Sequence, residues 1–331
     1  MGSKLAQRWV KENRMPLGAQ KAGLFGAAGA AAGGGQIGLF DGGAVSGGDT
    51  NVIDYITISS AGNATDFGDD VRNNNEGAGT DNGTDARGIF IGGFPEDAGQ
   101  DSISYVTITS AGNATDFGDA STTLYQCAAC SNGTNDRGIR YGGSAAADNA
   151  QIDYITITST GNASDFGDAP HVTEQRDSGT SNGTNERGVF SGGYRNGTNT
   201  NNIDYITINS ASNSTDFGDL SSGRENSSSC SSDTSERGVC AGGSSSNVID
   251  YITISSTGNS TDFGDCVDSG GNMQRGGTDS GTDNVGVWGG GVSTSTKTIE
   301  TITISSTGNA SDFGDRTLDA RGSQACANSK A

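Results

Sequence analysis

The stretch Asp54-Tyr-Ile-Thr-Ile-Ser-Ser-Ala-Gly-Asn-Ala-Thr-Asp-Phe-Gly-Asp69 decides the fold, because close copies of it occur six times in 331 residues. The phenylalanine of each copy marks the period. These residues are Phe67, Phe117, Phe166, Phe217, Phe263 and Phe313, at spacings of 50, 49, 51, 46 and 50 residues. A period near 50 indicates a repeat architecture, and it outweighs the chain length, which alone would suggest two domains.

Each copy predicts a strand, a turn and a second strand. Ile53 and Tyr55 point to one face of the first strand, and Ile56 and Ile58 to the other. Apolar residues on both faces indicate a sheet that is covered on both sides, as in a blade stacked between two others. The Gly62-Asn63 pair predicts the hairpin turn. We expect the aromatic residues of both strands to pack the blades: Tyr55, Phe67, Tyr105, Phe117, Tyr154, Phe166, Tyr205, Phe217, Tyr251, Phe263 and Phe313.

A second repeated element is a short strand that ends in a glycine pair, where the chain turns with positive φ or lets another backbone approach. Its copies are 36–43, 87–93, 137–143, 187–193, 237–243 and 284–290. Polar segments rich in small residues, such as 75–84 and 178–184, precede it and suit an innermost strand near an axis. Four strands in a unit of about 50 residues indicate a β-propeller, and six copies predict six blades.

The two ends of the chain predict how the ring closes. The repeats begin with a Gly-Gly strand, whereas residues 320–329 resemble one more innermost strand. One blade would therefore combine the C-terminal strand with three N-terminal strands, which removes the exposed sheet edges of an open array.

Composition narrows the class of protein. Apolar residues make up 31%, glycine accounts for 55 residues and the net charge is −20. These values alone are typical of disorder, but the apolar residues recur at regular positions. The negative charge argues against a nucleic-acid partner, since phosphate binding needs a basic face. We expect no membrane insertion and no signal peptide, and assembly in a cytoplasm, because no apolar run approaches about 18 residues.

Residues 1–21 differ from the rest, with a net charge of about +4 on an otherwise acidic chain. One interpretation is a frayed terminus. The other is a docking arm that orders on a partner, with a tryptophan as anchor. The docking residues in that hypothesis are Lys4, Arg8, Trp9, Lys11 and Arg14. Residues 22–35 are interpreted as a Gly/Ala linker and residues 36–331 as the propeller.

The six cysteines are Cys127, Cys130, Cys230, Cys240, Cys266 and Cys326. Three of them occupy one repeat position in alternate units, where the other units have threonine, so we do not expect them to be neighbours. A disulfide framework is therefore not expected. The Cys127-Ala-Ala-Cys130 segment provides half of a zinc site, but the other ligands are missing. We expect small, buried strand residues.

The repeated chemistry favours structure over catalysis. Asp-Phe-Gly in isolation resembles a kinase metal loop, but here it occurs six times without the partner loops. Pairs such as Asp66 and Asp69 could act as acid and base or bind calcium, yet a copy in every blade fits turns and ion pairs better. The recurring Arg87, Arg137, Arg187 and Arg237 are expected to pair with these aspartates. The single His171 is expected in a loop, and no catalytic, cofactor or metal residue is assigned.

The Gly-Gly pairs, the Tyr55 position and the Phe67 position together resemble the kelch repeat. The pattern departs from kelch in having Phe where Trp is usual, and Thr301 replaces the tyrosine of the sixth unit. The near-verbatim unit is also similar to repeats in structural proteins of tailed phages, especially those of marine cyanobacteria. Residues 15–22, Met-Pro-Leu-Gly-Ala-Gln-Lys-Ala, resemble a leader on such proteins. The resemblance covers residues 15–331.

That resemblance implies a non-enzymatic virion structural protein of the tail or appendage type, present in multiple copies. The N-terminal arm would bind other virion proteins, and the acidic propeller would contact proteins or a host surface through variable loops. These loops are 94–102, 144–151, 194–202 and 293–298. The alternatives are a carbohydrate-binding attachment module that uses Phe94 and Tyr194, a capsid-decorating protein, and an enzyme built on a propeller.

Overall fold

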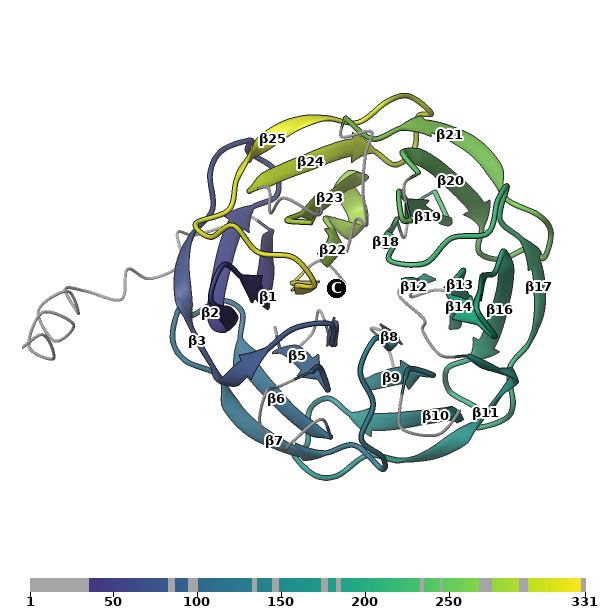
Figure 1. Ribbon diagram of the computed structural model, residues 1–331, viewed down its shortest axis with the longest axis horizontal. Coiled ribbons are helices and arrows are strands. Elements are labelled where there is room, and N and C mark those ends of the chain that lie inside the picture. Colours follow the sequence, from purple (N-terminus) through teal and green to yellow (C-terminus); the bar gives the residue numbers. More distant parts are fainter. Residues whose placement is uncertain are drawn as a thin grey trace, which may run out of the picture.

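Six four-stranded antiparallel sheets stand around one axis in the computed structural model, and each forms a blade of a β-propeller (Figure 1). The structure describes residues 36–82, 87–94, 101–132, 136–144, 149–173, 178–182, 186–232, 235–244, 246–267, 276–291 and 297–328. Within these residues there is also a small hairpin of β14 (Tyr194–Arg195) and β15 (Thr198–Asn199). The predicted all-β fold with six blades of four strands is confirmed.

The strands of each blade are given from the innermost to the outermost. Blade 1 contains β26 (Gln324–Ala327), β1 (Ile37–Val45), β2 (Gly48–Thr57) and β3 (Thr65–Asn74). Blade 2 contains β4 (Ala78–Asn82), β5 (Arg87–Ile91), β6 (Ser102–Thr107) and β7 (Thr115–Asp119). Blade 3 contains β8 (Ala128–Asn132), β9 (Arg137–Tyr141), β10 (Asn149–Thr156) and β11 (Ser164–Thr173).

The second half of the ring repeats this order. Blade 4 contains β12 (Ser178–Asn182), β13 (Arg187–Ser191), β16 (Asn202–Thr207) and β17 (Thr215–Asp219). Blade 5 contains β18 (Ser228–Ser232), β19 (Arg237–Ala241), β20 (Val248–Thr253) and β21 (Thr261–Asp265). Blade 6 contains β22 (Gly276–Asp279), β23 (Val285–Gly289), β24 (Thr298–Thr303) and β25 (Ser311–Asp315).

Ring closure follows the prediction, because β26 from the C-terminal end pairs with β1. Leu39 lies opposite Cys326 in this ladder, and the Ile37 N–H donates to Asn328 Oδ1 at 2.6 Å. The segments predicted as innermost strands contain β4 and β12, each at the inner end of its sheet, and Figure 1 shows β12 near the axis. Closure between strands from opposite ends of the chain gives blade 1 its innermost strand, so all six blades have four strands.

The apolar core lies between the blades. Ile53 of β2 packs with Phe90 and Val106 of blade 2, whereas Ile56 packs with Val287 of blade 6. Both faces of the strand are therefore covered by neighbouring blades, as the alternation predicts. Burying each such side chain stabilises the fold by about 1.5–3 kcal/mol, so packing between blades holds the ring together.

The innermost strands approach one another so closely that their side chains are small. A Cβ atom at Gly79 would lie 2.2 Å from the carbonyl oxygen of Ala325 on the next innermost strand. The following position alternates around the ring: Thr80, Cys130, Thr180, Cys230, Thr278 and Cys326. All six cysteines of the chain are buried, and none of them forms a disulfide. Burial raises the pKa of the Cys230 and Cys326 thiols well above the ordinary value, so both stay protonated at neutral pH.

The part of the chain that the structure describes contains little helix. Its one helical element is the 3₁₀ turn η2 (Gly281–Asp283), which connects β22 to β23. Asn284 ends this turn in the left-handed conformation at φ 59°. No helix among these residues is long and apolar enough to cross a membrane.

Candidate functional site: the loop-bearing face

The repeated Gly-Asn segment clasps each blade to the next, and the hairpin turn lies before it. The Ser60 N–H donates to the Thr57 carbonyl at 3.0 Å, so the chain turns earlier than predicted. Asn63 Oδ1 then accepts a hydrogen bond from the Asp315 N–H of blade 6 at 3.1 Å. Equivalent bonds run from Asp69 to Asn113, Asp119 to Asn162, Asp168 to Asn213, Asp219 to Asn259 and Asp265 to Asn309. The expected turn at Gly62-Asn63 is therefore corrected to a contact between blades.

The Asp-Phe-Gly segment forms the other half of this clasp. Phe67 is buried at the outer edge of the core. A Cβ atom at Gly68 would lie 2.4 Å from the carbonyl oxygen of Gly112 in blade 2. Glycine is required there because the neighbouring backbone leaves no space. The repeated Asp-Phe-Gly triplet therefore packs one blade against the next.

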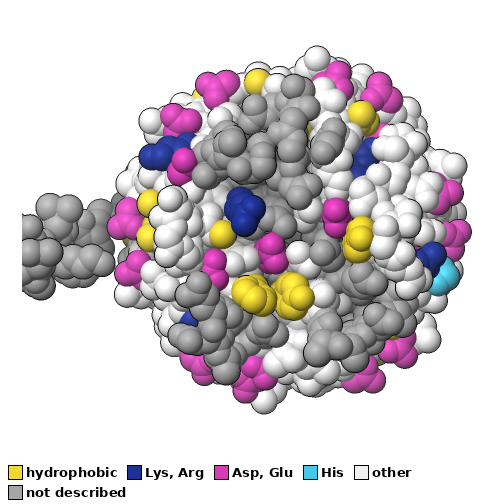
Figure 2. All heavy atoms as spheres, in the orientation of Figure 1, with side chains coloured by type: hydrophobic (Ala, Val, Ile, Leu, Met, Phe, Trp, Pro, Cys, Tyr) yellow, Lys and Arg dark blue, Asp and Glu magenta, His cyan; other side chains and the backbone are white. Residues whose placement is uncertain are grey.

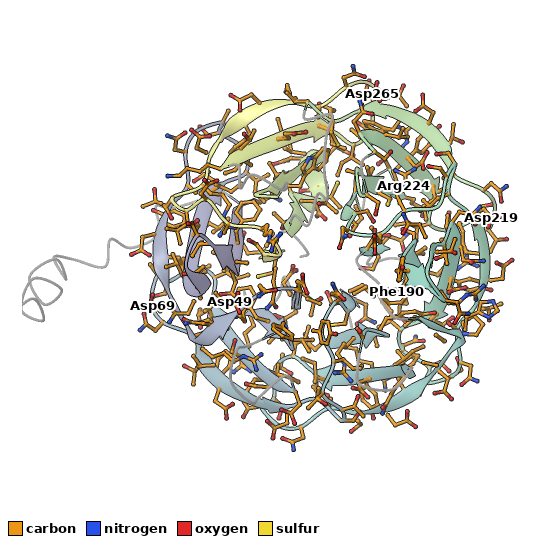
Figure 3. The ribbon with its side chains drawn as sticks, in the orientation of Figure 1. Asp49, Asp69, Phe190, Asp219, Arg224 and Asp265 are labelled. Carbon is orange, nitrogen blue, oxygen red and sulfur yellow. The ribbon has the colours of Figure 1, made fainter. Side chains whose placement is uncertain are left out.

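Aspartates of this segment form an acidic outer rim. Figure 3 shows Asp69, Asp219 and Asp265 at the circumference of the ring, away from the axis. Partial burial, followed by the charges of Asp69 and Asp54, raises the pKa of the Asp66 carboxyl. Among the described residues, no group of three or more His, Cys, Asp or Glu side chains is placed to hold a metal ion. His171 was expected in a loop, but it lies exposed in β11.

Tyrosine and phenylalanine from the two outer strands of a blade meet edge to face. Ring centroids are 6.0–6.2 Å apart in the pairs Tyr55–Phe67, Tyr105–Phe117, Tyr154–Phe166, Tyr205–Phe217 and Tyr251–Phe263. Phe313 of blade 6 is buried without such a partner, because Thr301 stands at the tyrosine position. The Thr301 hydroxyl donates instead to the Gly286 carbonyl at 3.0 Å. Each aromatic pair contributes about 0.5–1.5 kcal/mol beyond burial.

The repeated arginines contact tyrosine faces and carbonyl groups. The Arg87 guanidinium lies 4.6 Å from the centroid of the Tyr105 ring, and its Nη1 donates to the Ile157 carbonyl of blade 3 at 2.9 Å. The same two contacts recur for Arg137, Arg187 and Arg237. The expected pairing with aspartates is corrected, because a ring face and the next blade take the guanidinium instead.

Buried acids recur on the third strand of the blades, but their partners differ from blade to blade. The position holds Asp54, Asp153, Asp204, Asp250 and Glu300, with Ser104 in blade 2, and each is at most 2% exposed. Arg140 of β9 pairs with Asp153, and Arg316 of the β25–β26 connection pairs with Asp54 at 3.2 Å. The Trp288 indole N–H donates to Glu300 at 3.2 Å. Arg140 and Trp288 lie opposite their acids on the second strand, whereas Arg316 reaches its acid from a connection, so no single repeat position reveals these pairs.

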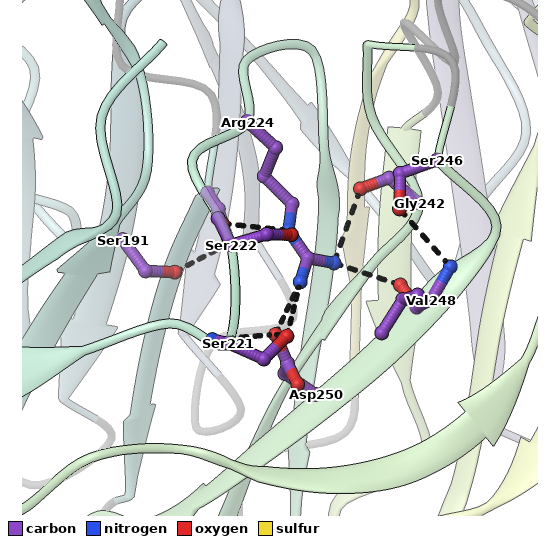
Figure 4. A network of polar contacts seen from close by, with 9 residues as sticks. Ser191, Ser221, Ser222, Arg224, Gly242, Ser246, Val248 and Asp250 are labelled. Carbon is purple, nitrogen blue, oxygen red and sulfur yellow. Dashed lines mark hydrogen bonds and ion pairs between the residues drawn. The ribbon is translucent and has the colours of Figure 1, made fainter.

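Arg224 makes the most extensive of these contacts (Figure 4). It is fully buried in the connection from β17 to β18, and its Nη2 donates to Asp250 and, at 3.1 Å, to Ser221 Oγ. Nη1 donates to the Val248 carbonyl at 2.8 Å. The guanidinium therefore ties a connection of variable sequence to the strands of blade 5.

One face of the propeller carries the variable connections, and Figure 2 shows that face. The loops that follow the glycine pairs bond to the connections between blades: the Phe94 N–H donates to the Asn75 carbonyl at 2.7 Å, and the Ser244 N–H to the Glu225 carbonyl at 2.9 Å. The connection from β25 to β26 crosses the same face toward the axis (Figure 1). Acidic side chains are scattered over this face and hydrophobic ones are few (Figure 2). We call it the loop-bearing face.

A depression opens at the axis of the loop-bearing face, and we call it the channel mouth. Its volume is ≈ 90 Å³, and the residues that begin the innermost strands line it. Glu76, Gln126 and Asn226 in its lining have left-handed backbones, with φ of 59°, 54° and 59°. Backbone bonds hold two of them: Gln126 N–H to the Glu76 carbonyl at 2.6 Å, and Glu76 N–H to the Gly322 carbonyl at 2.7 Å. Such backbone costs about 1–2 kcal/mol per residue.

An aromatic pair with one exposed and one half-buried ring stands beside the channel mouth. Phe94 is 42% exposed, and its ring meets that of Tyr125 with centroids 5.4 Å apart. Tyr125 directly precedes Gln126 of the mouth and was missed from the sequence, since it lies in the variable connection from β7 to β8. Tyr194, the other aromatic expected in a loop, is half-buried in the β14–β15 hairpin.

A buried carboxyl pair lies between blades 1 and 2. The Asn74 amide donates to Asp70 at 2.7 Å and to Asp41 at 3.1 Å, and Gln324 Nε2 donates to Asn74 Oδ1 at 3.0 Å. Burial, and then the charge of Asp70, raises the pKa of Asp41 well above the ordinary value. Burial likewise raises the pKa of Asp70. The pair therefore favours bound protons in the folded state.

The predicted docking arm lies outside the described residues, with Lys4, Arg8, Trp9, Lys11 and Arg14. Parts of three predicted contact loops also lie outside them: residues 95–100, 145–148 and 293–296. The loop at 194–202 is described in full and contains the β14–β15 hairpin. The structure therefore places on the loop-bearing face the residues that flank these loops.

Comparison with known proteins adds no relative. No protein-family model matches the chain, and a search of curated proteins found no similar sequence.

Proposed function

We propose that this chain is a non-enzymatic structural protein of a virion, which presents its loop-bearing face to another protein or to a host surface. The observation that carries the proposal is that the packing contacts are the same in the blades, whereas the connections on one face vary. Arginine, tyrosine, phenylalanine and the Asn clasp are used identically in blade after blade, whereas the connections on one face differ. A fold that repeats its packing and varies one face suits recognition of a partner.

The virion assignment rests on the resemblance of the repeat to phage structural proteins. The basic segment 1–21 supports docking, because it contrasts in charge with the acidic propeller and contains one large anchor residue, Trp9. Aromatic anchors surrounded by charge often dominate the binding energy of protein interfaces. In this proposal the arm binds another virion protein and the propeller projects from the particle.

Deletion of residues 1–21 tests the docking role. Particles would be assembled with full-length chain, with the deletion, and with a matched variant in which Lys4, Arg8 and Lys11 become glutamate. We expect both variants to fold as propellers by circular dichroism and to be lost from purified particles. Normal incorporation of either variant would refute the arm as the docking element. A density map of the wild-type particle separates a tail or appendage location from a capsid-decorating one.

A second candidate function is carbohydrate binding for attachment, and the Phe94–Tyr125 pair favours it. Exposed aromatic rings are the surfaces on which sugar C–H groups pack, and this pair stands next to polar groups of the channel mouth. Glycan-array binding by the full chain tests it, with Phe94→Ala compared with Val71→Ala. Val71 is a similarly exposed apolar residue, 46% exposed, and its change should have no effect. Absence of any glycan signal would reject this candidate.

A further inference from the structure

Backbone hydrogen-bonding groups point toward the axis just below the channel mouth. In an antiparallel pair, alternate residues direct both backbone groups away from the partner strand. Gly179 of β12 shows the direction, because its N–H donates to Ser229 Oγ of β18 at 3.1 Å and its carbonyl accepts from the same hydroxyl at 2.9 Å. The equivalent residues in the ladders of the other blades also line the depression: Gly79, Ala129, Ser229, Gly277 and Ala325.

Ser227 provides an independent sign that the depression takes a ligand. It lines the channel mouth from the connection to β18, and it is 2% exposed. Its Oγ has no hydrogen-bond partner within the described part of the chain. A buried hydroxyl without a partner is unfavourable, so a hydrogen-bonding group that enters the depression gains a contact that the protein alone does not supply.

The charges around the site select among ligand classes. Glu76 lies in the lining, and Asp81 and Asp279 line the channel below it. None of the described lining residues carries a positive charge. An anion would therefore be repelled. The backbone N–H groups, the amides and the Ser227 hydroxyl are donors that a bare cation cannot use. A neutral ligand whose hydroxyls both donate and accept matches this mixture.

We propose that the channel mouth binds a neutral, polyhydroxylated ring compound, of which a monosaccharide is the simplest example. Ser227, Glu76 and the axial backbone groups are its hydrogen-bonding partners. The Phe94–Tyr125 pair beside the mouth provides an apolar surface for the C–H face of the ring. This proposal rests on the carbohydrate-binding candidate for its class of ligand, and it places that ligand at the channel mouth.

The test is a titration of the full chain with neutral monosaccharides, followed by saturation-transfer NMR and calorimetry. Glucose, galactose, mannose and fucose serve as probes, with sialic acid and inorganic phosphate as anionic comparisons. We expect binding of at least one neutral sugar in the millimolar range and none of the anions. Ser227→Ala should weaken that binding by about 3- to 10-fold, the value of one hydrogen bond. Glu76→Gln is the second variant and should also weaken it.

Ser260→Ala is the matched control. Ser260 Oγ likewise has no partner among the described residues, but it lies beside β21, the outermost strand of blade 5, and does not line the channel mouth. Its change should leave sugar binding unaltered. Thermal unfolding of all variants checks that each is folded.

Three results would overturn the proposal. The first is no binding of any neutral sugar by the folded chain. The second is stronger binding of the anions. The third is binding that survives Ser227→Ala and Glu76→Gln but is lost in Phe94→Ala, which assigns the sugar to the aromatic pair and supports the attachment candidate without the channel mouth. Incorporation into particles is measured separately, so failure here is distinguishable from failure of the virion proposal.

Discussion

The interfaces between blades 3 and 4 and between blades 4 and 5 accommodate a buried acid in different ways. Each contains a buried acid on the third strand of the later blade. Between blades 3 and 4, the Tyr141 hydroxyl reaches Asp204 at 3.1 Å and Ser214 at 2.8 Å. Its ring stacks on Phe190 with centroids 4.0 Å apart. One neutral side chain thus supplies a donor and fills the volume.

Between blades 4 and 5, Ser191 stands at the position of Tyr141, and a guanidinium from the connection meets the acid. Arg224 donates to Asp250 Oδ2, while Asp250 Oδ1 and the Ser260 hydroxyl have no partner in the described chain. A small cavity of ≈ 10 Å³ remains, lined in part by Ser191 and Cys240. The comparison shows that the Arg224–Asp250 ion pair neutralises the buried charge but leaves space between the blades unfilled. The tyrosine both donates to the buried acid and fills that space.

Removing the cation should produce the largest effect on this comparison. Arg224→Met leaves Asp250 buried without its ionic partner, which costs about 3–5 kcal/mol of unfolding free energy. Arg321→Met is the control, since Arg321 is exposed and its change should stay within about 0.5 kcal/mol. Urea unfolding measures both variants. An equal stability of the two variants would show that the ion pair contributes nothing.

Removing the phenol should cost less. Tyr141→Phe keeps the stacked ring but deprives Asp204 and Ser214 of the hydroxyl, so we expect a loss of about 1–3 kcal/mol. The measurement is again the urea midpoint. A loss as large as that of Arg224→Met would mean that the two interfaces depend equally on their donors, contrary to the comparison.

A third interface, between blades 1 and 2, differs from the other two because its stability should depend on pH. The folded pKa of Asp41 and of Asp70 is raised above the unfolded value near 3.8, so the folded state binds protons more tightly. Unfolding free energy therefore decreases as the pH rises from the unfolded pKa through the raised folded values. We expect Asp41→Asn to raise the melting temperature at pH 7 and to flatten this decrease.

Melting curves of wild type and Asp41→Asn between pH 4 and pH 8 would test this. The same series on Arg224→Met is the comparison, because Asp41 and Asp70 are intact there and the decrease should persist. A wild-type stability that is independent of pH over the range, or that rises through it without a change in Asp41→Asn, would contradict the expected linkage.

The smallest effect should come from the serines next to the outermost strands. Ser214→Ala removes a bond to Tyr141 and should cost about 1 kcal/mol. Ser260→Ala removes a hydroxyl that has no partner among the described residues, so its effect should stay within about 0.5 kcal/mol. Differential scanning calorimetry of the two variants compares them directly. A larger loss for Ser260→Ala would indicate that an ordered water fills the cavity between blades 4 and 5.

Much of the fold could be predicted because the same pattern of strands and turns occurs six times in the sequence. The alternation of Ile53, Tyr55, Ile56 and Ile58 predicts a strand buried on both faces, and that is how β2 packs. Errors arose where a residue contacts another blade. Asn63 was interpreted within its own hairpin, but its partner is Asp315, 252 positions away. A period reveals what a residue shares with its copies and not which neighbour it meets.

The candidate site could be predicted only in outline. The sequence identified Phe94 as a loop aromatic, but Tyr125 and Ser227 carry no pattern that distinguishes them from other connection residues. Their significance is positional: Tyr125 meets Phe94, and Ser227 lines the channel mouth with its hydroxyl unsatisfied. Such convergence depends on connections from different blades meeting at one axis.

By itself the sequence determined the number of blades, the order of their strands and the closure by the C-terminal strand, because these follow from periodicity and from where the repeat starts and ends. Only the tertiary structure decided which partners the arginines and buried acids meet. Arg87 stacks on Tyr105, whereas Arg224 reaches Asp250 across a connection. The physical reason is that burial and hydrogen bonding act between blades, over separations in the chain that no local pattern encodes.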